Sequence, residues 1–408
     1  MLDDFIKSSN IDLKEINDKI DFIEEYNSEK VLNAFIDNGI SEVHFNSTTG
    51  YGYNDIGRDK IEDVYASIFR TEAALVRCQF ISGTHALTTC FFGLLRPGDT
   101  LLSISGKPYD TLDSVIGFND NPSSLKAYNI NYSQIDLVDN DFNYNSIRDY
   151  LSNNKVKVIE IQRSKGYSTR ESIGIDKIEK VIKLIKSIDK NIIVMIDNCY
   201  CELVSTKEPT EVGADICVGS LIKNLGGAIT SNGGYIVGKK ELVELCADRL
   251  NVPGQGREVG PSLNQNRYIL EGLYFAPMVV ANALKTAVYT AYLFEKLGYN
   301  VSPKYNDDRA DIVQNIIFNN ENDLIEYVRG IQYNSKVDSG ATIMPSEMPG
   351  YDDKIIMASG SFTEGSSIEL SCDGPLRSPY IAYQQGSISY KYGKIIVNRA
   401  IKRLIDNK

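Results

Sequence analysis

The sequence predicts an α/β protein in which a mostly parallel central sheet has helices on both faces and is followed by a smaller C-terminal α+β domain. Short apolar segments alternate with helix-like segments from Phe80 to Val237, and this alternation is typical of parallel sheets. Two polar residues of this region, Asp197 and Lys223, come just after apolar strand-like segments. Functional groups of such proteins gather at the carboxyl ends of the strands. We therefore expect a binding site at that edge of the sheet.

The chain of 408 residues is long enough for two or three domains with a sizeable core. Apolar residues at helical spacing predict two amphipathic helices in an N-terminal arm, residues 1–48. An arm of this length has no core of its own, so it must pack on another part of the protein or on a second subunit. A glycine-tyrosine turn then opens a large α/β domain, residues 49–275, and residues 276–408 form the smaller domain.

The periodicity of apolar residues places the individual elements. An apolar stripe predicts a helix over residues 59–77. Phe80-Ile81 is predicted as a strand that leads into Ser82-Gly83-Thr84 and a helix ending near Leu95. The other expected elements are strands at residues 100–104, 155–161, 191–196, 215–218, 234–237, 312–318 and 367–371, and helices at 177–188 and 262–296.

Composition excludes several classes of protein. The hydrophobic share of 42% and the charged share of 24% are those of an ordinary globular protein. A net charge of −11 without a basic run disfavours nucleic-acid and anionic-membrane partners. The most apolar stretch is interrupted by Pro277, Asn282 and Lys285, so we expect no membrane span. The acidic N-terminus does not resemble a signal peptide, and we expect a cytoplasmic protein.

The seven cysteines are scattered and the chain has only two histidines. Because no CxxC pair is present, we expect reduced, buried thiols and no metal site.

Lys223 and Asp197 together indicate a cofactor. Lys223 follows an apolar segment and precedes Gly226-Gly227. Desolvation is expected to lower the pKa of such a lysine, so that its neutral amine can form a Schiff base with a carbonyl. Asp197 ends an apolar strand, where a carboxylate can hold a protonated pyridine nitrogen. These are the two contacts that pyridoxal phosphate (PLP) requires.

The segment Ser82-Gly83-Thr84 is a candidate phosphate site. It opens a predicted helix, whose first N–H groups and dipole attract anions. The alternative is an ordinary helix N-cap. Ser220 can add a hydroxyl to the same phosphate or can simply be a small residue that ends a strand. The segment matches neither GxGxxG nor a Walker loop, which disfavours a nucleotide-binding protein.

Two further residues are candidate site residues because of the segments in which they lie. Tyr109 lies in a loop after the strand at 100–104 and can stack on a pyridine ring. The chain has 25 tyrosines, so a loop tyrosine without a function is the alternative. Arg377 stands in a glycine- and proline-rich segment and can hold a substrate carboxylate bidentately. The alternative for Arg377 is a solvated surface residue.

These residues match a known family. The chain resembles the PLP-dependent enzymes of cysteine and methionine metabolism, which have fold type I, the PLP-dependent transferase-like fold. Within them it is most similar to the branch described as methionine gamma-lyase-like or aluminium-resistance proteins, which are cystathionine beta-lyase-like. The segments that carry the resemblance are residues 52–59, 81–86, 197–200 and 219–224.

The resemblance implies roles at the cofactor. Lys223 would form the Schiff base and move protons, and Asp197 would keep the pyridine nitrogen protonated. The implied phosphate ligands are Ser82, Gly83, Thr84 and Ser220. Tyr109 would stack on the ring and assist the leaving group as an acid.

The resemblance also implies substrate and subunit contacts. Arg377 would bind the α-carboxylate of an amino-acid substrate. Tyr53 and Arg58 would reach the phosphate in a neighbouring subunit, which implies a homodimer or homotetramer with shared active sites.

The implied reaction is that of a carbon–sulfur lyase. A sulfur-containing, or otherwise Cβ- or Cγ-substituted, amino acid would undergo α,β- or α,γ-elimination through the Lys223 Schiff base and a quinonoid. A PLP-dependent replacement transferase and a non-catalytic PLP-binding homologue are the alternatives.

Several positions depart from the family pattern. Tyr53 and Arg58 are farther apart than the corresponding pair of better-known lyases. Cys201 and Leu225 stand where a glycine and a proline are usual. Residues 161–167 lack the asparagine that binds the phenolic oxygen of the cofactor, and Gln162, Arg163 or Ser164 can take its place.

Overall fold

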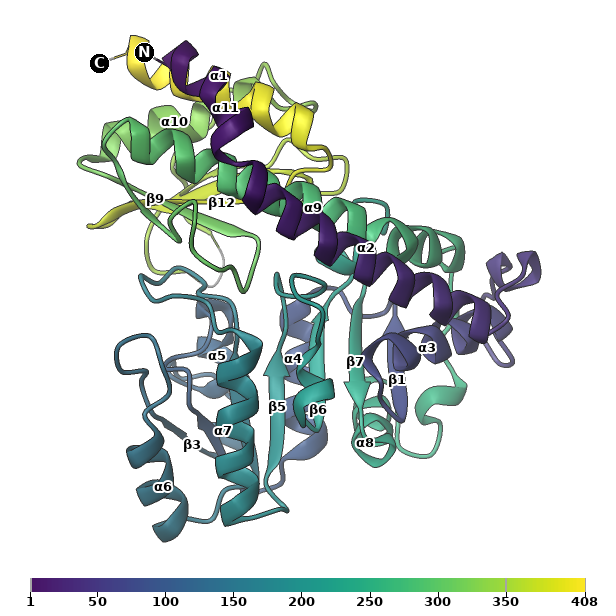
Figure 1. Ribbon diagram of the computed structural model, residues 1–408. Helices are drawn as coiled ribbons and strands as arrows, with labels where there is room; N and C mark the ends of the chain where they lie inside the picture. The colour runs from purple at the N-terminus through teal and green to yellow at the C-terminus, as the bar shows by residue number, and fades with distance from the viewer. Residues whose placement is uncertain (1, 349–350, 408) are drawn as a thin grey trace.

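The computed structural model describes residues 2–348 and 351–407, which form two sheets connected by the long helix α9 (Asn266–Lys296). In Figure 1 the larger sheet occupies the lower half of the molecule and the smaller sheet lies above it. None of the helices built by the described residues has the length and apolar character that a bilayer crossing requires.

The larger sheet has seven strands in the order β1-β7-β6-β5-β4-β2-β3. Strands β3, β2, β4, β5 and β6 are parallel, whereas β7 and β1 are antiparallel to their neighbours. The predicted mostly parallel sheet is therefore confirmed. The strands are β1 (Ala73–Arg77), β2 (Thr100–Ser103), β3 (Asn131–Gln134), β4 (Val158–Gln162), β5 (Ile193–Asp197), β6 (Ile216–Ser220) and β7 (Gly234–Gly238).

Helices cover both faces of this sheet because its central strands are apolar on both sides. In β5, Val194 and Ile196 belong to one hydrophobic cluster and Ile193 and Met195 to another. Helices α3 (Ile56–Phe69), α6 (Tyr144–Asn153) and α7 (Ile175–Ile188) contribute to the first cluster, and α4 (Gly83–Leu94) and α8 (Lys240–Leu250) to the second.

The smaller sheet is antiparallel, with the strand order β10-β11-β12-β9-β8. Helix α10 (Glu321–Tyr333) packs on it, and α11 (Tyr390–Asp406) packs on α10 and α9. Its strands are β8 (Asn300–Ser302), β9 (Val313–Phe318), β10 (Ile355–Ala358), β11 (Ser371–Pro375) and β12 (Tyr380–Gln385).

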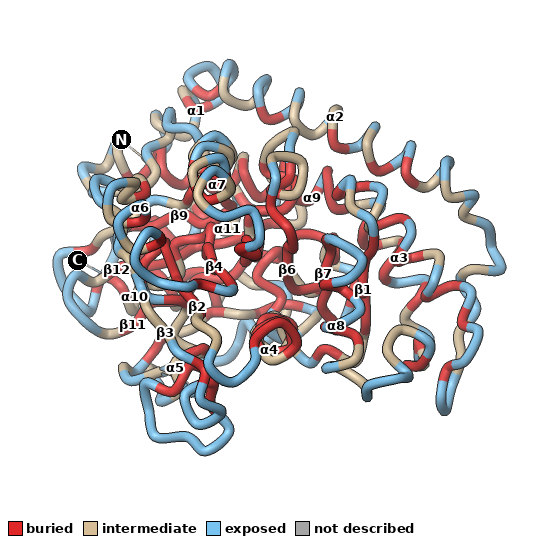
Figure 2. Tube along the Cα trace, turned by 90° about the horizontal axis from the view of Figure 1, so that it is seen from below, coloured by how far each residue is buried: buried red, intermediate tan, exposed pale blue. Residues whose placement is uncertain are grey.

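The predicted N-terminal arm consists of α1 (Leu2–Asp12) and α2 (Lys14–Asp37), which lie along α9 (Figure 1). The inner side of α2 is buried, whereas much of its outer side is exposed (Figure 2). The arm also bonds to both halves of the molecule. Asn27 Nδ2 donates to Leu203 O at 3.0 Å in the large domain, and Asn10 Oδ1 accepts from Lys394 Nζ at 3.1 Å in α11.

Two sequence predictions near the start of the large domain are wrong. The helix predicted over 59–77 ends at Phe69, where Arg70 takes a left-handed φ of 50°. Residues 73–77 then form β1, which pairs with β7. The segment Phe80-Ile81 is not a strand, and Ile81 is 77% exposed. A short strand whose residues are all buried shows no alternation of apolar and polar residues. Its pattern therefore cannot be distinguished from a continuation of the preceding helix.

The strand predicted at 367–371 is also misplaced. Residues Ser367–Glu369 form a 3-10 turn, Leu370 has a φ of 92°, and β11 begins only at Ser371. The other predicted strands and helices are confirmed, with ends shifted by a few residues. Strand β3 was not predicted, because its residues are exposed or only partly buried, as expected at a sheet edge.

Candidate active site

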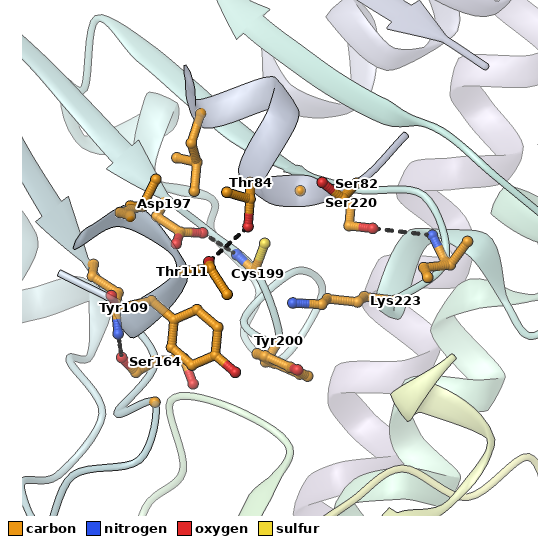
Figure 3. Close-up of a pocket in the computed structure, with 16 residues that line it drawn as sticks. Ser82, Thr84, Tyr109, Thr111, Ser164, Asp197, Cys199, Tyr200, Ser220 and Lys223 are labelled. Atoms are coloured by element: carbon orange, nitrogen blue, oxygen red, sulfur yellow. Dashed lines mark hydrogen bonds between the residues drawn. The ribbon is translucent and has the colours of Figure 1, made fainter. Parts of the chain in front are cut away.

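Strands β4, β5 and β6 end at one edge of the sheet, where a cavity of about 160 Å³ opens (Figure 3). The register pairs Gln162 with Asp197 and Asp197 with Val218, so the last residues of β4 and β5 lie side by side, next to Val218 near the end of β6. The cavity is lined by Ser82, Gly83, Thr84, Leu87, Tyr109, Thr111, Leu112, Gln162, Ser164, Gly166, Asp197, Cys199, Tyr200, Ser220, Ile222 and Lys223.

Asp197 supplies a buried carboxylate at this edge. Its side chain is 6% exposed, and Oδ1 accepts a hydrogen bond from Cys199 N at 3.0 Å. Burial raises the pKa of Asp197, whereas the charge of Lys223 lowers it. The carboxylate and the ammonium therefore stabilise each other in the charged form.

Lys223 enters the cavity from the turn after β6. Asn224 Nδ2 donates to Glu202 O at 2.9 Å and fixes this turn. Gly227 has a φ of 52°, and a Cβ there would lie 2.1 Å from Gly272 O of α9. Glycine is thus required for the turn to pack on α9.

The expected lowering of the Lys223 pKa is wrong. Burial does lower the pKa, but Cys199, Tyr200 and Asp197 outweigh burial and raise it above its ordinary value. The Nζ atom lies 3.9 Å from the centroid of the Tyr200 ring, where the ring face attracts a cation. The sequence indicated only the effect of desolvation on this pKa, because it does not show which side chains lie next to Lys223.

The segment 82–84, called the anion cradle below, opens α4 as expected, and its binding of a phosphate stays a prediction. Ser82 is the N-cap, and its Oγ accepts from His85 N at 3.1 Å. The N–H groups of Gly83 and Thr84 have no acceptor among the described residues. A Cβ on Gly83 would lie 3.3 Å from Cys199 Sγ and 3.4 Å from Ser220 Cβ. The missing side chain keeps the space between α4 and β6 open.

Gln162 presents an unused polar atom to the same cavity. Its side chain is 6% exposed, and Nε2 donates to Ser164 O at 2.9 Å. Buried Oε1 has no hydrogen-bond partner among the described residues. Such an atom is costly unless a ligand satisfies it. With the anion cradle at one end and Asp197 at another, the lining fits a flat molecule with a phosphate and a basic ring nitrogen, such as PLP.

Tyr109 lies on the cavity wall. Its ring centroid is 6.0 Å from that of Tyr167 and 6.0 Å from that of Tyr351, and the hydroxyls of Tyr109 and Tyr351 share a short hydrogen bond. Burial, together with Tyr351, raises the pKa of Tyr109 well above its ordinary value. The phenol is therefore protonated at neutral pH.

The structure does not bring Tyr53 and Arg58 into the cavity of their own chain. Arg58 is 3% exposed, and its Nη1 donates to Gly52 O at 2.7 Å and to Gly260 O at 3.0 Å. Tyr53 is 55% exposed beside Tyr51. Arg58 thus holds its own loop, and the contact of both residues with a neighbouring subunit stays a prediction.

Arg377 also lies outside this cavity. Its Nη1 donates to Asp353 Oδ2 at 2.8 Å and its Nη2 to Tyr167 O at 3.1 Å. Arg377 lines an adjacent cavity of about 70 Å³, whose lining also includes Tyr167 and Tyr351. Its role at the substrate carboxylate stays a prediction.

Sequence reasoning missed Tyr200 as a residue of the cavity, and also Tyr167, Tyr351 and Asp373, which lie behind Tyr109. Tyr200 follows Asp197 closely, and its backbone has a φ of 71°, which a bulky residue rarely adopts. Its position next to a candidate aspartate was the only signal that could have identified it.

Two buried carboxyls behind the site make stability depend on pH. Burial raises the pKa of Glu160 and of Glu202 to about 8, from an ordinary 4.5. The folded protein holds these protons, so their stabilising effect is complete below pH 4.5 and is lost as the pH rises through 8. Each group changes the free energy of unfolding by at most about 1.4 kcal/mol per pH unit.

We therefore expect the Tm to fall between pH 6 and pH 9, and Glu202→Gln to reduce this fall, because a neutral amide has no proton to lose. Differential scanning fluorimetry across this range measures the effect. Exposed Glu244→Gln serves as the control. An unchanged pH dependence in Glu202→Gln would show that Glu202 is already charged in the folded protein.

The fold and the site together define a class of protein. A mostly parallel sheet, a lysine and an aspartate at its carboxyl edge and a helix N-terminus opposite them are the arrangement of fold-type-I PLP-dependent enzymes. Within that class, the chain belongs to the methionine gamma-lyase family, whose model matches residues 2–405.

Relatives cover nearly the whole chain. The protein YnbB of Bacillus subtilis (strain 168), described as uncharacterized, is 45% identical over 97% of this chain and 95% of its own length. A solved structure from Clostridium novyi NT, described as a carbon-sulfur lyase involved in aluminum resistance, is 44% identical with a TM-score of 0.95, covering 99% of this chain and 96% of that one. The PLP-dependent protein YhfS of Escherichia coli shares the fold, with a TM-score of 0.64 at 16% identity over 95% of this chain and 97% of that one.

Proposed function

We propose that the protein binds PLP through Lys223 and is a carbon–sulfur lyase that releases a thiol from a sulfur-containing amino acid by elimination at Cβ or Cγ. The observation that carries this proposal is the placement of Lys223 and Asp197 in one cavity with the anion cradle of α4. Family membership and the likeness to the Clostridium novyi lyase support it.

Residues of the cavity would hold PLP at three points. Asp197 would bind the ring nitrogen, and the N–H groups of Gly83 and Thr84, with the Ser220 hydroxyl, would bind the phosphate. Gln162 would donate the second N–H of its Nε2, whose first is bonded to Ser164 O, to the phenolic oxygen of PLP. When bound, PLP supplies an electron sink for the electron pair left at the substrate Cα.

Two side chains would move protons in the reaction. The amine of Lys223 would take the proton from the substrate Cα, because it is the base that lines the cavity beside Asp197. The neutral phenol of Tyr109 would give a proton to the departing sulfur. Addition of water then yields a thiol, a 2-oxo acid and ammonia.

Absorbance and product analysis test the proposal. The protein loaded with PLP should be yellow, and borohydride should fix the cofactor on the peptide that contains Lys223. L-cystathionine and L-methionine are then supplied separately, and thiol and 2-oxo acid are assayed. Equal amounts of both products from either thioether support the lyase. Absence of 2-oxo acid from both, together with thioether formation from O-acetyl-L-homoserine and a thiol, would identify a replacement transferase instead.

We further propose that the protein is a homodimer or homotetramer with shared sites. Exposed aromatic and aliphatic side chains support this, among them Tyr51, Tyr53, Ile56 and Ile81, exposed by 73%, 55%, 50% and 77%. Their loops are tied together, because Gln79 Nε2 donates to Pro261 O at 2.6 Å and Gly260 N to Tyr51 O at 2.9 Å. Ile81 precedes the anion cradle, so this surface borders the site.

Light scattering should therefore give at least a dimer. Tyr53→Ala should weaken PLP binding about 10-fold through loss of a hydrogen bond to a charged group, as measured by fluorescence titration. Tyr51→Ala, at a neighbouring exposed ring, is the control. A monomer that binds PLP with unchanged affinity would contradict the shared site.

A further inference from the structure

The ammonium of Lys223 lies on the ring face of Tyr200. Its Nζ atom is 3.9 Å from the ring centroid, and Figure 3 shows the two side chains next to each other in the cavity. Among the described residues, no carboxylate forms an ion pair with Lys223, so Asp197 acts on the ammonium through its longer-range charge. A ring face attracts a cation most strongly where water is excluded. Tyr200 is therefore a residue that holds the Lys223 ammonium by direct contact.

The backbone of Tyr200 has a conformation that a bulky residue rarely adopts. Its φ of 71° lies in the left-handed region, where glycine and asparagine are common and a tyrosine costs folding free energy. The small domain fixes this residue, because Tyr200 O accepts a hydrogen bond from Ile312 N at 3.2 Å. The Tyr200 ring also packs against the cluster formed by Val313, Ile381 and Tyr383. These contacts keep the ring in place beside Lys223.

The proposed reaction leaves Lys223 without a covalent partner in every cycle. The substrate amine would take its place on PLP, and the freed amine of Lys223 would then act at the substrate Cα. Because a lysine side chain has four flexible carbons, the freed amine must be confined near the Cα for efficient proton transfer. Once Lys223 accepts the Cα proton it becomes an ammonium, which is the form that the Tyr200 ring binds.

We propose that Tyr200 is a positioning residue, which holds the Lys223 ammonium on its ring whenever Lys223 is not joined to PLP. The inference rests on the proposed lyase function and adds to it a residue that acts through the base of the reaction. Loss of the ring has two effects of opposite direction. A larger fraction of free Lys223 becomes neutral, which speeds its reaction with an aldehyde. The amine is also less confined near the substrate Cα, which slows turnover.

The reaction of the PLP-free protein with pyridoxal tests the contact apart from turnover. Pyridoxal has no phosphate, so its capture does not depend on the anion cradle. The neutral amine attacks the aldehyde carbon and water leaves, so the rate follows the fraction of Lys223 that is neutral. Tyr200→Leu should react at least about 3-fold faster at pH 7.5, because no ring favours the ammonium. Absorbance gives the rate, and borohydride trapping with peptide mapping confirms that Lys223 carries the adduct.

The PLP-loaded protein tests the effect on proton transfer. With a thioether that the wild type cleaves, Tyr200→Leu should lower kcat about 10-fold and change KM little, since the base is less well positioned. Deuterium at the substrate Cα should slow the variant more than it slows the wild type, because removal of the Cα proton then limits the rate to a greater extent.

Three variants isolate the ring face. Tyr200→Phe keeps the ring, so pyridoxal capture and kcat should stay within about 2-fold of the wild type. Tyr383→Leu removes a buried ring from the same cluster that does not line the cavity, and both rates should stay unchanged. Leucine suits a φ of 71° no better than tyrosine does, so Tyr200→Leu leaves the backbone cost unaltered. Should it fail to fold, Tyr200→Asn also removes the ring and suits this backbone.

The outcomes separate this inference from the proposed function, because pyridoxal capture needs no substrate. Capture that is unchanged or slower in both Tyr200→Leu and Tyr200→Asn would overturn the inference. Equal acceleration in Tyr383→Leu or Tyr200→Phe, or faster capture with an unchanged kcat and isotope effect, would overturn it as well. Faster capture in Tyr200→Leu, beside a wild type that releases no thiol from any thioether, would instead remove the lyase function and leave the contact with Lys223 standing.

Discussion

Lys223→Ala is expected to abolish thiol release, with kcat at least about 10⁴-fold below the wild type. The substitution removes both the amine that would hold PLP and the base at the substrate Cα, and general base catalysis alone contributes up to about 10⁴. Rates are measured by thiol and 2-oxo acid assays with saturating PLP. The same variant should lose its yellow colour on gel filtration, because PLP would be held by non-covalent contacts alone.

Lys240→Ala is the matched control, since Lys240 is exposed at the start of α8. This variant should retain colour and rate. Lys223→Arg keeps a positive charge beside Asp197 but has no amine that forms an imine, so it should be inactive and colourless. Substantial activity in either Lys223 variant would place the reactive amine elsewhere in the chain.

Asp197→Asn is expected to lower kcat about 10²- to 10³-fold, the usual effect of removing one electrostatic contact to the reacting group. The amide is similar in shape but cannot keep a pyridine nitrogen protonated. The substitution also removes the Asp197 charge, which raises the pKa of Lys223. The visible absorbance of the PLP-loaded variant should therefore titrate at a pH different from that of the wild type.

Asp215→Asn provides the comparison for Asp197→Asn. Asp215 is equally buried, but it is paired with Lys186 and Lys239 at the other end of the strands. Its substitution should lower the Tm and leave the absorbance titration unchanged. If Asp197→Asn also lowers the Tm without moving that titration, its carboxylate serves folding only.

The part of the site made by short segments could be predicted from the sequence. Lys223, Asp197 and the 82–84 turn each follow a strand or open a helix, and parallel strands bring such positions to one edge whatever the loops do. The sheet itself was predicted from the alternation of short apolar segments with helix-like segments. Strand β1 escaped prediction because five buried residues after a helix carry no distinct period.

The contacts behind Tyr109 could not be predicted in this way. The contact between Tyr167 and Asp373 spans 206 residues, and it exists only because β11 packs against the loop after β4. Nothing in the local pattern around Asp373 distinguishes it from an ordinary strand residue. For the same reason the bond of Arg377 to Asp353 was not foreseen.

The arm along α9 has a mechanical consequence. Its helices are bonded at one end to the turn after β5 and at the other to α11, so they brace the two sheets against each other. Rotation of the small domain as a rigid body would strain both attachments at once. Access for a substrate is then expected to come from movement of the loop around Tyr167, with the angle between the two sheets held constant.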